Sequence, residues 1–189
     1  MAGMTRREWL RDAAVLGAAV AVPAGLPGRA GAQGGKRELN VAQGGDISKF
    51  DPHFSTSSND IRVSFNIFDN LISRHPDGKL HPGLATEWKL QNSTQWTFKI
   101  RQGVKWHNGD PFTAEDVKFS LERTWDPKVG TRVSTVFTTI DRVEALNPTT
   151  VVIHTKKPDP LLAARLAFYG GQIVPKKYLE KVGDRKSVV

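Results

Sequence analysis

The chain has 189 residues, of which 39% are hydrophobic and 24% are charged, and it carries a formal net charge of +8. This balance is typical of a folded domain with a sizeable core and excludes an intrinsically disordered protein. The sequence contains no cysteine, which excludes disulfides, thiolate metal sites and cysteine nucleophiles, and we expect no lipid anchor. Lys and Arg are scattered along the chain, so no nucleic-acid partner is expected.

Residues 1–32 have the layout of an export signal. Arg6 and Arg7 precede a weakly hydrophobic, alanine-rich run, and Ala30 and Ala32 form an A-x-A cleavage site. The apolar run is roughly half as long as a membrane-spanning helix requires. The paired arginines resemble a twin-arginine (Tat) signal, with the general secretory route as the alternative. We therefore expect export by the Tat machinery.

The mature part begins with a predicted strand over residues 38–43, followed by a polar, turn-rich stretch over residues 46–59. Apolar residues then recur at helical spacing and predict a helix that Asn59 or Asp60 caps. The apolar positions of this helix are Ile61, Phe65, Phe68 and Ile72, with Leu71 beside them.

Period-two alternation next predicts two strands with one buried face, joined by a turn over residues 92–94. Their inward residues are Trp88 and Leu90, then Trp96, Phe98 and Ile100. A further short strand is predicted from Val104 to Trp106, before a tight Asn108–Gly109 turn.

A capped amphipathic helix follows, with Thr113 as its N-cap and Asp116 as the partner in a capping box. Ala114, Val117 and Leu121 form its apolar stripe. The remaining predicted elements are a strand over 150–154, a helix over 159–168 and a helix over 175–182 that Gly183 ends. The fold class is therefore mixed α/β.

Several short motifs occur in an order that resembles the family 5 (peptide/nickel-type) extracellular solute-binding proteins of ABC importers. They are D-P-H at 51–53, F-D-N-L at 68–71, P-G-L-A at 82–85, W-T-F at 96–98, F-T-A-E-D-V at 112–117, S-L-E-R at 120–123 and I-V-P at 173–175. The resemblance implies a periplasmic-binding-protein-like (type II) fold of two lobes that close over a solute. Residues 33–183 would then be an incomplete first lobe.

The resemblance also implies that two hydroxyl-rich segments face the cleft between the lobes, over residues 53–59 and 128–136. The candidate ligand-binding residues are His53, Ser55, Thr56, Ser57, Ser58, Asn59, Val133, Ser134 and Thr135. The aromatic strands and the capped helix are expected to be scaffold.

The sequence offers little for catalysis. The five histidines form no H-x-x-H or H-E-x-x-H pair, and only His53 lies in a predicted cleft segment, so no metal site and no cofactor are expected. Glu115 and Asp116 are adjacent on a helix and point in different directions. G-x-S-x-G and phosphate-binding loops are absent. We expect a binding protein and not an enzyme.

The sequence thus predicts the periplasmic solute-binding subunit of an ABC importer, monomeric when complete, with a di- or oligopeptide as solute and permease subunits as partners. Nickel chelate, haem or oligosaccharide remain alternative solutes, and an exported solute-sensing module is the alternative function. Residues 184–189 depart from the family pattern and match a translated sequencing adapter, so we expect a non-native tail behind a truncated gene. With half of the cleft missing, the chain alone should bind solute weakly.

Overall fold

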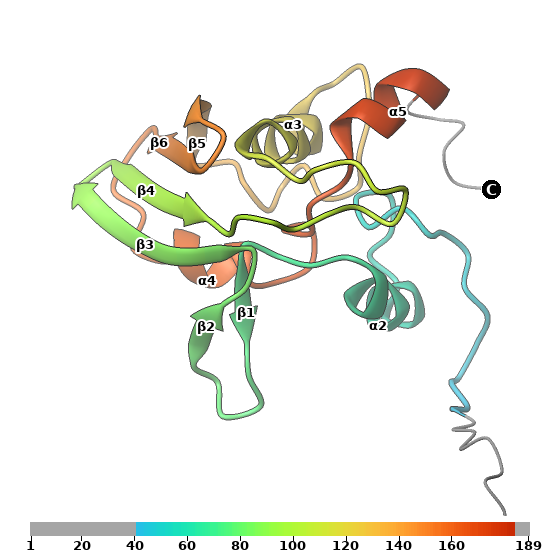
Figure 1. Ribbon diagram of the computed structural model, residues 1–189. Helices are drawn as coiled ribbons and strands as arrows, with labels where there is room; N and C mark the ends of the chain where they lie inside the picture. Colours follow the sequence, from blue (N-terminus) through green and yellow to red (C-terminus); the bar gives the residue numbers. More distant parts are fainter. Residues whose placement is uncertain (1–40, 184–189) are drawn as a thin grey trace, which may run out of the picture. The chain divides into compact units, whose positions relative to one another are not determined.

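The computed structural model of the chain describes residues 41–183, and its largest element is a four-stranded antiparallel sheet (Figure 1). The strands are β3 (Ala85–Asn92), β4 (Gln95–Ile100), β5 (Ile140–Asn147) and β6 (Thr150–Thr155). Their order in the sheet is β3-β4-β6-β5. A separate hairpin of β1 (Ile72–Arg74) and β2 (Leu80–Pro82) precedes the sheet along the chain.

The core lies between one face of this sheet and helix α3 (Ala114–Trp125), which packs against β5 and β6. Phe98 of β4 pairs with Val151 of β6, and both are fully buried. The stripe predicted for α3 is confirmed, because Val117 and Leu121 are buried in the same cluster. Each such side chain stabilises the fold by about 1.5–3 kcal/mol.

The predicted capping box of α3 is also present. The backbone N–H of Thr113 donates to Asp116 Oδ2 at 2.9 Å, and Asp116 Oδ1 accepts the backbone N–H of Lys176 at 3.0 Å. Lys176 opens helix α5 (Lys176–Val182), which ends at Gly183 as predicted. The cap residue therefore joins α3 to a helix 60 positions further along the chain.

The helix predicted from Ile61 to Ile72, with Asn59 or Asp60 as its cap, is wrong at both ends. Helix α2 runs only over Ser58–Ile67, with Ser57 as N-cap, and Ile72 begins strand β1. Asn70 lies outside the helix, because its Nδ2 donates to the carbonyls of Leu166 and Phe168, at 3.0 and 2.8 Å. Distant backbone acceptors thus outweigh the local helical pattern.

Three other predicted elements differ from the structure. Residues 41–43 form no strand, and the rest of the strand predicted over 38–43 lies outside the described residues. The strand predicted from Val104 is reduced to one isolated bridge, between Lys105 and Pro111. Helix α4 spans only Leu162–Leu166, because the Asp159 carboxylate accepts the backbone N–H of Leu161 and holds the preceding residues in a turn.

Strand β5 was not predicted from the sequence. Its buried residues Ile140 and Val143 are three positions apart, which hides the period-two signal. The cause is an irregularity in the pairing with β6 between Ile140 and Arg142. Among the described residues, no helix has the length and apolar character needed to cross a membrane.

Candidate functional site

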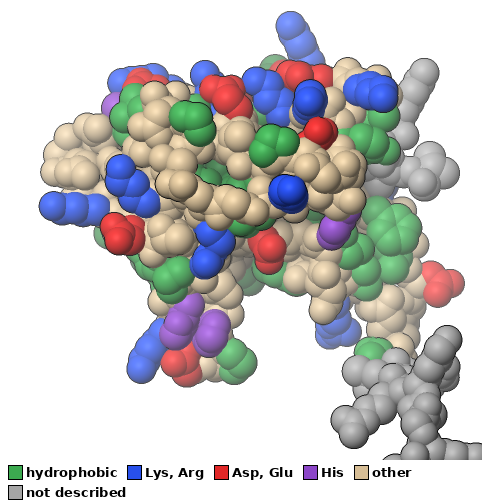
Figure 2. Space-filling model, in the orientation of Figure 1, with side chains coloured by type: hydrophobic (Ala, Val, Ile, Leu, Met, Phe, Trp, Pro, Cys, Tyr) green, Lys and Arg blue, Asp and Glu red, His purple; other side chains and the backbone are tan. Residues whose placement is uncertain are grey.

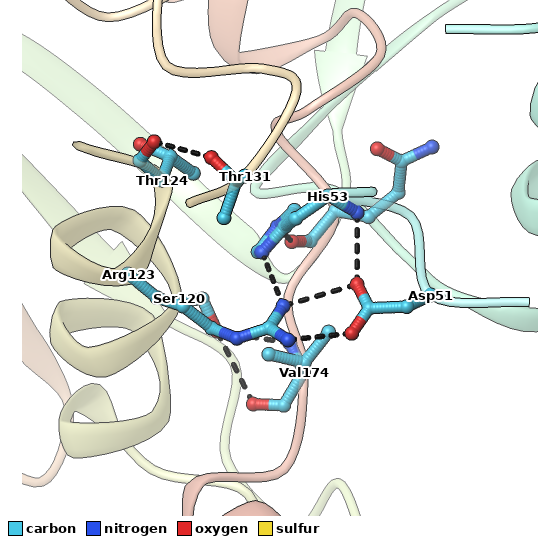
Figure 3. Close-up of polar contacts among 8 residues, drawn as sticks. Asp51, His53, Ser120, Arg123, Thr124, Thr131 and Val174 are labelled. Atoms are coloured by element: carbon cyan, nitrogen blue, oxygen red, sulfur yellow. Dashed lines mark hydrogen bonds and ion pairs between the residues drawn. The ribbon is translucent and has the colours of Figure 1, made fainter. Parts of the chain in front are cut away.

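A buried ion pair joins the loop that follows residue 50 to helix α3 (Figure 3). Arg123 Nη1 donates to Asp51 Oδ1 at 3.0 Å, and Arg123 Nη2 donates to Asp51 Oδ2 at 2.5 Å. The two side chains are almost completely removed from solvent. This bidentate geometry fixes the start of the first candidate segment on a rigid helix.

The ring of His53 extends this pair into a network. Arg123 Nη1 lies 2.9 Å from His53 Nδ1, and His53 Nε2 lies 2.9 Å from the carbonyl oxygen of Gln172 (Figure 3). A guanidinium can only donate, so Nδ1 accepts and Nε2–H donates to Gln172. The imidazole is therefore neutral, with its proton on Nε2.

His53 is also fully buried, with 0% of its surface exposed. The sequence predicted that His53 faces the solute; in the structure its ring is buried and links Arg123 to Gln172. Both ring nitrogens of His53 are engaged inside the fold.

A second carboxylate, Asp60 in the first turn of α2, shapes the rest of the first segment. Its Oδ2 accepts the hydroxyls of Ser55 and Ser48, at 2.6 and 2.7 Å, and its Oδ1 accepts the backbone N–H of Ser48 at 2.8 Å. Burial alone raises the pKa of Asp60, but the hydrogen bonds from Ser55, Ser48 and Lys49 outweigh burial and hold this pKa below its usual value. Ser55 is thus buried, and its hydroxyl joins the loop to Asp60.

The second candidate segment is tied directly to the first. The backbone N–H of Arg132 donates to the carbonyl of His53 at 2.9 Å. Thr131 Oγ1 donates to the carbonyl of Thr124 at the end of α3, at 2.5 Å (Figure 3). Val133 is fully buried beside Gly170, where an added Cβ would lie 3.0 Å from the Cβ of Val133. Val133 therefore anchors the segment from inside.

The structure divides the nine candidate residues into three groups. His53, Ser55 and Val133 are interior and hold the two segments in place. Asn59 is partly buried, and the hydroxyl residues that remain are exposed to solvent: Thr56, Ser57, Ser58, Ser134 and Thr135. The two segments meet at the hydrogen bond from the Arg132 N–H to the His53 carbonyl, and their exposed side chains are mostly hydroxyl groups, beside the charged Lys128 and Arg132.

Open cavities of the described residues lie elsewhere. Three open cavities of about 540, 460 and 500 Å³ are lined by the β3–β4 region, by the α2–hairpin region and by the α3–β5 region. None of the five exposed hydroxyl residues lines them. The described residues also contain no group of three or more His, Asp or Glu placed to hold a metal ion.

The buried network is the part of this region that sequence reasoning missed. Asp51 and Arg123 both belong to recognised motifs, yet nothing in the sequence pairs them across 72 positions. One signal was present: Arg123 lies on the helix face of Ser120 and Thr124, beside the apolar stripe, where a charged side chain needs a buried partner. The signal residues Arg6, Arg7, Ala30 and Ala32 lie outside the described residues.

Comparison with known proteins places these features in a family. The family model described as "Bacterial extracellular solute-binding proteins, family 5 Middle" matches residues 79–188, more than half of the chain. The chain is 29% identical over 167 residues to the periplasmic oligopeptide-binding protein OppA of Haemophilus influenzae. That alignment covers 79% of this chain and 31% of OppA.

Solved structures show the same relationship. The structure of H. influenzae OppA in complex with the peptide RPPGFSPFR matches with a TM-score of 0.70 and 27% identity, over 77% of this chain and 33% of that one. MoaA from A. tumefaciens R10, in complex with mannopinic acid, matches with a TM-score of 0.69 and 36% identity, over 76% of this chain and 31% of that one. The mixed α/β class and a periplasmic-binding-protein fold are thereby confirmed, in part of its full length.

The chain spans about a third of the length of the curated relatives it matches. The family model covers the part of the chain that holds the motifs from P-G-L-A at 82–85 onward, and the fold agrees with the matched structure over the aligned part. The chain therefore belongs to the family 5 extracellular solute-binding proteins.

Proposed function

We propose that this chain is part of the substrate-binding subunit of an ABC importer, which captures a solute outside the cytoplasmic membrane. The single observation that carries the proposal is the family match over more than half of the chain. Lobe closure over the solute then presents the loaded protein to permease subunits. The protein acts by binding, without a catalytic step, and is a monomer when complete.

Export to the periplasm is part of the same proposal. Matched relatives are periplasmic binding proteins, and residues 1–32 carry the Arg6–Arg7 pair and the Ala30-x-Ala32 cleavage pattern. We assign Tat as the export route because the apolar run behind the arginines is short and rich in alanine.

The solute is proposed to be a di- or oligopeptide. The matched OppA proteins are oligopeptide-binding proteins, and one of them was solved with a bound peptide. Thr56, Ser57, Ser58, Ser134 and Thr135 offer hydroxyls that can donate to peptide carbonyls and accept from peptide N–H groups. Neutral groups of this kind can bind a peptide backbone, because its hydrogen-bonding pattern stays the same when the side chains of the peptide differ.

Mannopinic acid is a second candidate solute. The structure of MoaA in complex with this compound is 36% identical to this chain, against 27% for the OppA peptide complex. The same hydroxyl surface can bind a polyhydroxy acid, so the two candidates are separated by experiment.

The test is solute binding by the protein expressed from its genomic gene, beside the 189-residue chain. Thermal unfolding is followed with di- and tripeptides and, separately, with mannopinic acid. We expect peptides to raise the melting temperature of the genomic protein. A rise with mannopinic acid alone supports the second candidate, and a folded protein that responds to neither set of compounds contradicts both.

A pair of variants tests the hydroxyl surface itself. The double variant Ser134→Ala/Thr135→Val is expected to weaken solute binding by about tenfold or more, because two exposed hydrogen-bonding groups are lost. Ser93→Ala, in the exposed β3–β4 turn, is the matched control and should leave binding unchanged. Equal binding by the double variant and the control would place the solute elsewhere.

A further inference from the structure

The β1–β2 hairpin holds two histidines on one face. Ser73 pairs with His81 across the hairpin, and the backbone N–H of His75 donates to the carbonyl of Lys79 at 3.1 Å. His75 and His81 are therefore diagonal neighbours, a spacing at which long side chains meet. The buried Ile72 anchors the hairpin in the core, which fixes this arrangement.

The two imidazoles are in contact. Their ring centroids lie 3.8 Å apart and their planes differ by 18°. Figure 2 shows two adjacent purple side chains at the lower edge of the molecule, where Figure 1 places the hairpin. The ring of His75 is exposed, and that of His81 is partly covered.

His81 carries a buried nitrogen that has no hydrogen-bond partner among the described residues. Its Nε2 is removed from solvent, and no donor or acceptor of the fold reaches it. Buried polar atoms are almost always satisfied, and an exception calls for a specific explanation such as an ion. The unsatisfied nitrogen and the neighbouring exposed imidazole together provide two ligand atoms of the same kind.

We propose that His75 and His81 form a two-imidazole binding site for a divalent transition-metal ion of the Zn²⁺ type. Imidazole nitrogen is a preferred ligand of Zn²⁺, Cu²⁺ and Ni²⁺. Rotation of the exposed His75 ring out of the stack turns one of its nitrogens toward an ion held by His81. No third His, Asp or Glu of the described residues completes a ligand set, so water fills the remaining positions.

The surroundings argue against a hard cation at this place. Asp77 is the carboxylate of the hairpin turn, and its Oδ1 accepts the backbone N–H of Lys79 at 2.9 Å. Its Oδ2 lies 3.9 Å from Lys79 Nζ. Mg²⁺ and Ca²⁺ require several oxygen ligands, whereas the hairpin offers two nitrogens and one engaged carboxylate.

The test is calorimetric titration of the untagged full chain with Zn²⁺ in a non-coordinating buffer. We expect one saturable equivalent, its loss in His75→Ala and in His81→Ala, and no response to Mg²⁺. A ¹H–¹⁵N spectrum of the histidine rings should show that Zn²⁺ shifts the His75 and His81 signals first. Each variant is checked for cooperative unfolding, so that a lost site is distinguished from a lost fold.

His107 serves as the control, because it is exposed in a turn outside the hairpin. His107→Ala should bind Zn²⁺ as the unchanged chain does. The proposal is overturned if His107→Ala removes the equivalent, or if the folded chain shows no saturable Zn²⁺ binding. Solute binding at the hydroxyl surface is independent of either result.

Discussion

The guanidinium of Arg123 grips the carboxylate of Asp51 through two parallel N–H···O bonds, at 2.5 and 3.0 Å, although 72 positions separate the two residues. Arg123 also faces the ring of Phe54, with its Cζ 5.2 Å from the ring centroid. The first candidate segment is thus attached to α3 by charge and by an aromatic contact. Arg123 thus holds the start of this segment, in addition to the hydrogen bonds of Asp60 and His53.

Arg123→Met is expected to destabilise the fold by about 3–5 kcal/mol, because it leaves the carboxylate of Asp51 buried without a counter-charge. Urea unfolding at neutral pH measures the change in the free energy of unfolding. A variant that no longer unfolds cooperatively also supports the prediction. Arg142→Met removes an arginine from the exposed pairs with Asp141 and Glu144 and should leave the midpoint unchanged. Equal midpoints for the two variants would show that the buried pair contributes no more to stability than the exposed pairs.

The ring of His53 is expected to be neutral and protonated on Nε2. Arg123 occupies Nδ1 as a donor, and the carbonyl of Gln172 accepts from Nε2. Long-range ¹H–¹⁵N spectra at pH 7.5 distinguish the two tautomers, and His53→Gln identifies the signal. A proton on Nδ1 would contradict the network as described.

Acid should loosen the first candidate segment through Asp60. Its pKa is lower in the folded chain than in the unfolded chain, so the unfolded chain binds more protons as the pH falls. The contribution of Asp60 is therefore present above the unfolded pKa of about 3.8 and is lost as the pH falls through the lower folded value. Melting temperatures between pH 6 and pH 2 measure this loss.

Asp60→Asn should flatten that acid decline, and Ser48→Ala should move it to higher pH because one donor to the carboxylate is removed. Thr56→Val changes an exposed hydroxyl of the same loop and serves as the control with an unaltered pH profile. An acid decline that is identical in Asp60→Asn and the unchanged chain would assign the decline to other groups.

Gly170→Ala should destabilise more than Gly130→Ala. Both glycines have positive φ, +81° and +69°, so each alanine carries a backbone cost of about 1–2 kcal/mol. Only at Gly170 does the new Cβ also crowd a neighbour, Val133, at 3.0 Å. Urea unfolding of both variants, and of Gly170→Ala with Val133→Ala, separates crowding from backbone strain. Equal losses of stability in the two glycine variants would show that the contact with Val133 does not contribute.

Elements with a strong local signal were predicted to within a few residues. Strand β4 has the expected buried face of Trp96, Phe98 and Ile100, and α3 begins directly after its N-cap Thr113. These elements follow from side-chain period and capping, which are properties of neighbouring residues. The hairpin β1–β2 was missed because Leu71 and Ile72 continue the helical pattern of α2.

The candidate site was predicted less completely, for a related reason. The hydroxyl-rich composition of two segments is visible in the sequence, and the structure joins those segments through the His53 carbonyl and the Arg132 N–H. The division into interior and exposed residues is set by partners far along the chain, such as Gln172 for His53 and Gly170 for Val133. No local pattern encodes those partners.

The long-range hydrogen bonds of Asn70 and His53 also limit when this part of the fold can form during synthesis. A ribosome releases the chain from its N-terminus, so Asn70 emerges long before Leu166 and Phe168, the sources of its two acceptors. His53 is separated from its acceptor, the carbonyl of Gln172, by a still longer stretch of chain. A nascent chain that stops short of these residues lacks the carbonyl acceptors of Asn70 and His53. The hydrogen bonds of Asn70 and His53 can therefore form only after the chain has been synthesised as far as their acceptors.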